Sequence, residues 1–130
     1  MKARLPEEDR RLAKLTRICA VLPEATRTLM GPHAAFSIRK KTFVYFLNDH
    51  HGDGIVGLSC KVLPGDNVAL IAANPEKFYM PAYVGSRGWV GIRLDRGKID
   101  WEEIQELVMH SYRLIAPKRL VATLPPETDS

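Results

Sequence analysis

Residues 78–95, FYMPAYVGSRGWVGIRLD, form the most distinctive stretch of this sequence. Two turn signals, Met80-Pro81 and the glycine-flanked Gly85–Gly88, precede an apolar run that alternates from Trp89 onward. A looped segment followed by a strand over Trp89–Leu94 is therefore predicted. No reaction motif lies in this stretch, so it predicts a fold rather than a chemistry.

Working outward from this stretch, apolar residues at helical spacing predict three helices and alternating residues predict the strands. The helices are expected from Pro6 to the residue before Pro23, from Pro64 to Asn74, and from Asp100 to Pro117. The strands are expected over 34–39, 42–47, 55–62, 89–94 and 120–124, with a tight turn at Lys40-Lys41. This order predicts one α+β domain over residues 1–124, a two-layer sandwich with helices on one face of an antiparallel sheet, and a mobile tail over 125–130.

The composition is typical of a soluble globular protein, with 45% hydrophobic and 26% charged residues. The longest apolar runs, 18–22 and 68–73, are too short for a membrane span or a secretory signal. We therefore expect a cytoplasmic protein that does not associate with membranes. Cys19 and Cys60 stand outside any metal-binding spacing and are expected to be buried free thiols.

Positive charge is concentrated in the first third of the chain. Residues 1–45 hold ten Lys/Arg and four acids (+6), whereas the remainder holds nine and eleven (−2), which together give +4. A basic N-terminal portion can attract the phosphates of nucleic acid or of a small anion. The same charge also serves solubility.

The combination of Phe78-Tyr79-x-Pro81-x-Tyr83-x-Gly85, Gly88-Trp89-Val90, Asp100-Trp101 and Ser111-Tyr112 resembles the MmcQ/YjbR family. These are small bacterial proteins often labelled DNA-binding, and the resemblance covers nearly the whole chain, to residues 116–119. It implies a fold similar to that of the frataxin-like CyaY proteins, with hairpins described as a double wing. The DNA-binding label rests largely on that shape, and no catalytic set comes with the family. Relatives commonly have a glycine in the first hairpin turn, where this chain has Lys40-Lys41, so a more basic wing tip is expected.

The leading functional hypothesis is a non-enzymatic protein that binds DNA weakly and without sequence preference. A basic hairpin tip can reach a groove or a row of phosphates while the sheet holds it rigid. An arginine beside glycine-flanked backbone amides can also hold a phosphate. The residues assigned to this function are Arg39, Lys40, Lys41, Arg87 and Arg96.

Two alternatives stay open. A small-molecule-binding protein, or an enzyme whose reaction the sequence does not reveal, would place aromatic rings beside convergent polar groups. That pocket would be lined by Tyr79, Tyr83, Arg87, Trp89, His110 and Tyr112. A protein-interaction module would instead expose an apolar patch.

Neither a cofactor nor a metal is predicted. Gly52-x-Gly54-x-x-Gly57 matches the dinucleotide fingerprint as a string, but it leads into a strand rather than a helix, so its amides would not face a pyrophosphate. Asp49 resembles the start of a calcium loop, yet the twelfth position is Cys60 and not the bidentate Glu that the ion needs.

Overall fold

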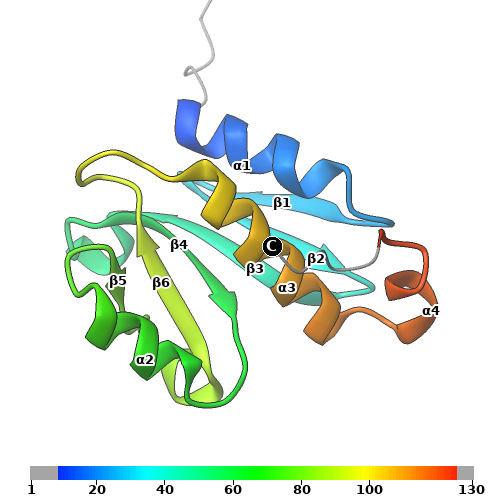
Figure 1. The fold of residues 1–130 in the computed structure, drawn as a ribbon. Helices are drawn as coiled ribbons and strands as arrows, with labels where there is room; N and C mark the ends of the chain where they lie inside the picture. The colour runs from blue at the N-terminus through cyan, green and yellow to red at the C-terminus, as the bar shows by residue number, and fades with distance from the viewer. Residues whose placement is uncertain (1–8, 126–130) are drawn as a thin grey trace, which may run out of the picture.

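The computed structural model describes residues 9–125, which form a six-stranded antiparallel sheet covered by helices (Figure 1). The strand order is β1-β2-β3-β4-β6-β5, so the first four strands form a meander. The strands are β1 (Thr26–Met30), β2 (His33–Ile38), β3 (Lys41–Asn48), β4 (Val56–Lys61), β5 (Phe78–Tyr79) and β6 (Trp89–Arg93). The helices are α1 (Arg10–Ala20), α2 (Asp66–Ala73), α3 (Trp101–Ile115) and α4 (Lys118–Val121), with 3-10 turns η1 (His50–Gly52) and η2 (Gly85–Arg87).

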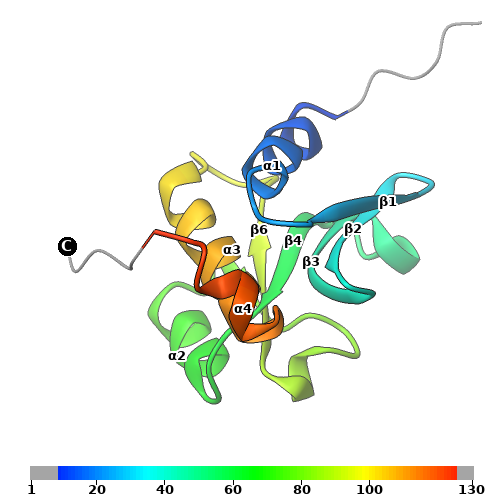
Figure 2. The ribbon, with the colours of Figure 1, turned by 90° about the vertical axis from the view of Figure 1, so that its right-hand side faces the viewer.

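Helices α1, α2 and α3 cover one face of the sheet, as Figures 1 and 2 show together. On this face Phe46, Leu58 and Ile92 stand opposite one another across β3, β4 and β6, and all three are buried. Helix side chains such as Leu15 and Val108 complete the same core. The predicted α+β class, with helices on one face of an antiparallel sheet, is confirmed.

Helix α3 is fixed to the sheet by two consecutive residues. The Ser111 hydroxyl donates a 2.7 Å hydrogen bond to the Phe43 carbonyl and accepts a 2.9 Å bond from the Lys61 amide, so it joins α3 to two strands. The Tyr112 hydroxyl donates to the Pro23 carbonyl at 2.7 Å. Its ring packs edge-on against Phe43, with centroids 5.4 Å apart. These contacts set the height of α3 above the sheet and its direction.

The turn of the β2–β3 hairpin differs from the prediction by one residue. Its central residues are Arg39 and Lys40, with φ of 49° and 68°, and Lys41 already begins β3. Two consecutive positive φ angles are characteristic of the type I′ turn, whose twist matches that of the flanking strands. The strands therefore continue to the turn without splaying.

Both ends of the chain also differ from prediction. Strand β1 was not expected, because all five of its residues are exposed and it lacks the apolar alternation that marks a half-buried strand. The strand predicted over Leu120–Leu124 is wrong, since Pro117 is the N-cap of the short helix α4 and Leu120 packs on the core. The start of the predicted first helix at Pro6 and nearly all of the predicted tail fall outside the described residues.

The two cysteines are buried free thiols, as predicted. Burial raises the pKa of the Cys60 thiol to about 12, and desolvation likewise raises the pKa of Cys19. Both therefore behave as small apolar core side chains at neutral pH. Within residues 9–125, no helix combines the length and the apolar character needed to cross a bilayer.

Replacing Ser111 with Ala should lower the free energy of unfolding by about 3 kcal/mol, because the Phe43 carbonyl and the Lys61 amide both lose their buried partner. Urea denaturation measures the change. Ser86→Ala, at an exposed position, is the matched control and should leave the midpoint within experimental scatter. Equal stability of Ser111→Ala and wild type would show that the hydroxyl does not hold the helix.

Candidate functional site

The hairpin turn between β2 and β3 carries three consecutive basic residues, but they are not equivalent. The Arg39 guanidinium forms two 3.1 Å hydrogen bonds to the Glu24 carboxylate. Lys40 and Lys41 are exposed. The Arg39 hydrogen bonds hold the pKa of the Glu24 carboxyl below its usual value, and the Arg119 charge adds to this effect. The turn thus offers two exposed ammonium groups beside an arginine that is already paired.

Helix α4 adds positive charge next to this turn. Lys118 and Arg119 of α4 are exposed. The Arg119 charge helps to lower the pKa of Glu24, the partner of Arg39, so Arg119 lies within electrostatic range of the turn. We define the basic end as Lys40, Lys41, Lys118 and Arg119. Sequence reasoning missed its second half, although the Pro117-Lys118-Arg119 order could have suggested a helix start that carries charge.

The other two arginines assigned to nucleic acid lie at opposite ends of the sheet. Strand β6 runs antiparallel to β4, with Trp89 opposite Lys61, and β4 runs antiparallel to β3. Arg87, just before β6, is therefore at the sheet end that also holds the β2–β3 turn. Arg96 follows β6 and lies at the far end. One binding surface cannot include Arg96 and the turn without spanning the length of the sheet.

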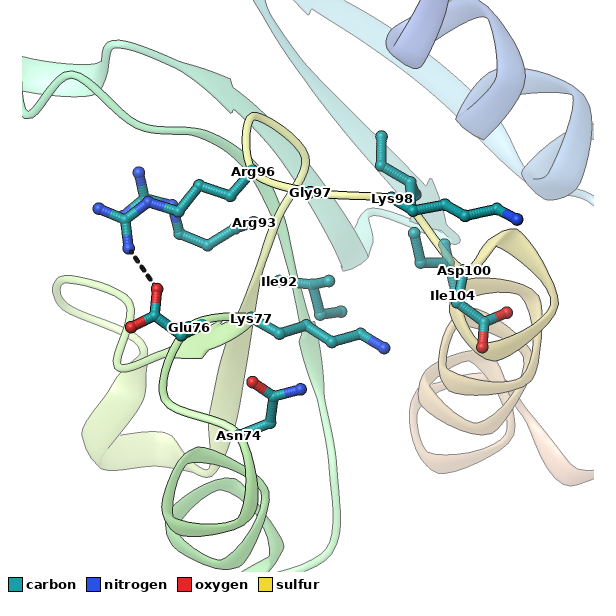
Figure 3. Close-up of a pocket in the computed structure, with 11 residues that line it drawn as sticks. Asn74, Glu76, Lys77, Ile92, Arg93, Arg96, Gly97, Lys98, Asp100 and Ile104 are labelled. Atoms are coloured by element: carbon teal, nitrogen blue, oxygen red, sulfur yellow. Dashed lines mark hydrogen bonds and ion pairs between the residues drawn. The ribbon is translucent and has the colours of Figure 1, made fainter.

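Arg96 instead lines a cavity of about 330 Å³ between the end of α2 and the start of α3 (Figure 3). Four basic side chains line this cavity, but three of them have acidic partners. Lys77 pairs with Glu103, Arg93 with Asp95 at 2.9 Å, and Arg96 with Glu76 at 3.4 Å. The cavity is therefore largely neutralised and is a poor site for phosphate.

The face of the sheet away from the helices is organised around Tyr79. Its ring lies across the adjacent strands β6 and β4, where a side chain at Gly91 would come within 2.4 Å of the ring and one at Gly57 within 2.8 Å of the hydroxyl. Glycine is required at both positions, because any Cβ would push the ring away. Gly57 therefore has a packing role, and its place in a dinucleotide-like string is coincidental.

Residues 80–88 form a loop that crosses this open face (Figure 2). Asn67 of α2 anchors the loop, since its buried side-chain amide donates to the Gly85 carbonyl at 3.0 Å and to the Trp89 carbonyl at 3.1 Å. Within the loop, Pro81 is buried. The sequence did not predict this anchor. The helix was predicted from its apolar residues, whereas the buried residue of α2 is the polar Asn67.

The structure divides the six residues predicted to line one pocket. Tyr79 and Trp89 lie on the open face, and Tyr83 and Arg87 belong to the loop that crosses it. The prediction that His110 and Tyr112 line the same pocket is wrong, because both lie on α3 on the other side of the sheet. The sequence predicts that both residues are in a helix, but it does not predict which face of the sheet that helix covers. Among the described residues, no group of three or more His, Cys, Asp or Glu is placed to hold a metal ion.

Replacing Asn67 with Ala should detach the loop from α2. We expect a loss of about 2 kcal/mol in the free energy of unfolding, since the buried Trp89 carbonyl loses the Asn67 donor and the Gly85 carbonyl keeps only the Gly88 amide. Hydrogen exchange at the Gly88 and Trp89 amides should also accelerate, because both bond within the loop. Asn74→Ala, at the exposed end of the same helix, is the control. Unchanged exchange in Asn67→Ala would show that the loop is held by other contacts.

Burial raises the pKa of Tyr79 from 10.0 to about 12, with Asp53 and Asp95 adding to the effect. The unfolded chain therefore releases the Tyr79 proton at lower pH than the folded protein. Stability from this group is complete below pH 10 and is lost as the pH rises toward 12, by about 3 kcal/mol. Tyr79→Phe should show a shallower decline in the unfolding midpoint over this range. Parallel declines in both proteins would contradict the assignment.

Comparison with known proteins bears on the whole chain. A family model described as YjbR matches residues 20–114. A crystal structure of a Deinococcus radiodurans protein, described as a DUF419 domain, is similar at 24% identity with a TM-score of 0.67, over 83% of this chain and 80% of that chain. A Pseudomonas syringae protein is similar at 15% identity with a TM-score of 0.59, over 82% and 97%. At these identities the structures share the fold alone, and comparison with curated proteins finds no match.

Proposed function

The chain belongs to the YjbR family, and we propose that it binds DNA weakly and without sequence preference through the phosphate backbone, using the basic end. The observation that carries this proposal is that two exposed basic pairs from distant parts of the sequence, Lys40-Lys41 and Lys118-Arg119, are related through Glu24, which pairs with Arg39 and feels the Arg119 charge. Each of these four side chains can pair with a phosphate.

The shape of the basic end suits a phosphate row better than a base-reading site. The turn is short and fixed by the β2–β3 ladder, so its lysines approach a surface without a large loss of backbone freedom. Lysine contacts phosphate as a point charge and carries little geometric selectivity. The structure describes no long recognition helix beside this turn, since α4 spans only Lys118–Val121. Binding without sequence preference follows from this combination.

The predicted set of residues changes accordingly. Lys40 and Lys41 remain at the centre of the proposed site, and Arg39 acts mainly by holding Glu24. Arg87 lies at the same end of the sheet and can extend the contact. Arg96 is left out, because it is at the opposite end and pairs with Glu76.

The experiment is a titration of labelled duplex DNA at several salt concentrations. With four phosphates neutralised, affinity should fall about a hundredfold between 50 and 200 mM salt. Lys40→Glu/Lys41→Glu should weaken binding at low salt and make the salt dependence shallower, because two contacts are replaced by repulsion.

The matched control is Arg96→Glu/Lys98→Glu, which makes the same change in net charge at the other end of the sheet. It should bind nearly as well as wild type if the basic end is the site. Equal loss in the two double variants would mean that net charge alone attracts DNA. Absence of binding by wild type at low salt would refute the proposal.

A further inference from the structure

We propose that the open face of the sheet holds a binding site for a small, uncharged aromatic molecule with one hydrogen-bonding group, and that the Ser59 hydroxyl is the partner of that group. This site is separate from the basic end and does not depend on the proposed binding of DNA. It occupies a cavity of about 290 Å³ between the sheet and the loop of residues 80–88. That volume is near the lower limit for small-molecule sites.

Ser59 is the buried polar group at the base of the cavity. It lies on β4 between Tyr45 and Gly91 of the neighbouring strands, and its exposed fraction is 1%. Its hydroxyl oxygen has no hydrogen-bond partner among the described residues. Ser111, on the other side of the sheet, is also buried but bonds to two backbone groups. A buried hydroxyl that no protein group satisfies is costly, and a ligand in the cavity would satisfy it.

The walls of the cavity select for an apolar, planar molecule. Aliphatic side chains from the sheet and the loop line it together with two tyrosines, and no Lys, Arg, Asp or Glu is among the described residues that line it. The Tyr45 ring is supported by Trp89, with ring centroids 5.6 Å apart. Such walls exclude a charged ligand, since its desolvation would not be offset, and they favour stacking of an aromatic ring. The main wall residues are Met30, Tyr45, Leu47, Pro81, Tyr83 and Val84.

Two histidines, His33 and His50, also line the cavity, and the hydrogen bonding of His33 shows a neutral imidazole. His33 accepts a 3.0 Å hydrogen bond from the Asn48 amide through Nδ1, which requires the neutral tautomer with hydrogen on Nε2. The His50 ring stands edge-on to it, with centroids 5.3 Å apart. A neutral imidazole at the rim agrees with an uncharged ligand.

The cavity is preformed rather than induced. The Asn67 hydrogen bonds fix one end of the loop that roofs it, and Pro81 near the other end of the loop is buried. Tyr83 is held at φ 66°, an unfavourable conformation for a bulky residue, and its side chain is 79% exposed although it lines the cavity. Backbone strain of this kind persists where the surrounding structure imposes it, and it is concentrated at binding sites.

The test uses two probes of similar shape, indole, which carries an N–H donor, and indene, which does not. Each is titrated into the labelled protein, and amide chemical shifts are followed by NMR. Saturable shifts are expected at Leu47, Ser59 and Val84, with indole bound about fivefold more tightly than indene because only indole bonds to the hydroxyl. In Ser59→Ala the two probes should bind equally.

Ser86→Ala is the matched control, since Ser86 is exposed in the same loop and does not line the cavity. It should keep the fivefold preference for indole. The melting temperature of Ser59→Ala should not fall, because the lost hydroxyl has no protein partner. The proposal is overturned if neither probe gives saturable shifts, if the shifts map to another part of the protein, or if Ser59→Ala still prefers indole. None of these outcomes depends on whether the protein binds DNA.

Discussion

The two hydrogen bonds of the Ser111 hydroxyl are the constraint on which the rest of the structure depends. They join α3 to the Phe43 carbonyl and to the Lys61 amide, and so they fix the helix over the face on which Phe46, Leu58 and Ile92 form the core. On the opposite face, the loop of residues 80–88 is the cover that the described part of the chain supplies. Helix α4 follows the end of α3, and the Arg119 charge that it carries acts on Glu24, the partner of Arg39 in the β2–β3 turn. The position of α3 thus separates the closed core from the open face of the sheet.

Much of the fold was predictable because most helices and strands have a local sequence pattern that identifies them. Asp100 caps α3 by accepting from the Glu103 amide, and the alternation from Trp89 gives β6. β1 was not predictable in this way, since an exposed edge strand is held by backbone hydrogen bonds rather than by a pattern of burial. α4 was missed because four residues are too few to show helical spacing. In both cases the neighbouring structure, and not the segment itself, determines the conformation.

The candidate sites were only partly predictable, for a reason of geometry. Sequence identifies a basic turn at Lys40 and Lys41 without any knowledge of the partner strands, but it does not reveal that α4 lies beside it. Nor does it reveal that Tyr79 and Tyr112 face opposite sides of the sheet, because that depends on strand parity and on the docking of α3. Ser59 gave no signal at all. Its significance lies in the absence of a hydrogen-bond partner among the described residues, which is a property of three-dimensional structure.

The hairpin turn has a further consequence for how this protein can change. Arg39 and Lys40 both have positive φ. Glycine or asparagine would lower the conformational free energy of this backbone region by about 1 kcal/mol per residue. A more stable hairpin is therefore within reach of one or two substitutions, and each would remove a cation from the tip. A substitution that stabilises the turn therefore also lowers its positive charge. The hairpin tip cannot become more stable and more basic through changes at these two positions.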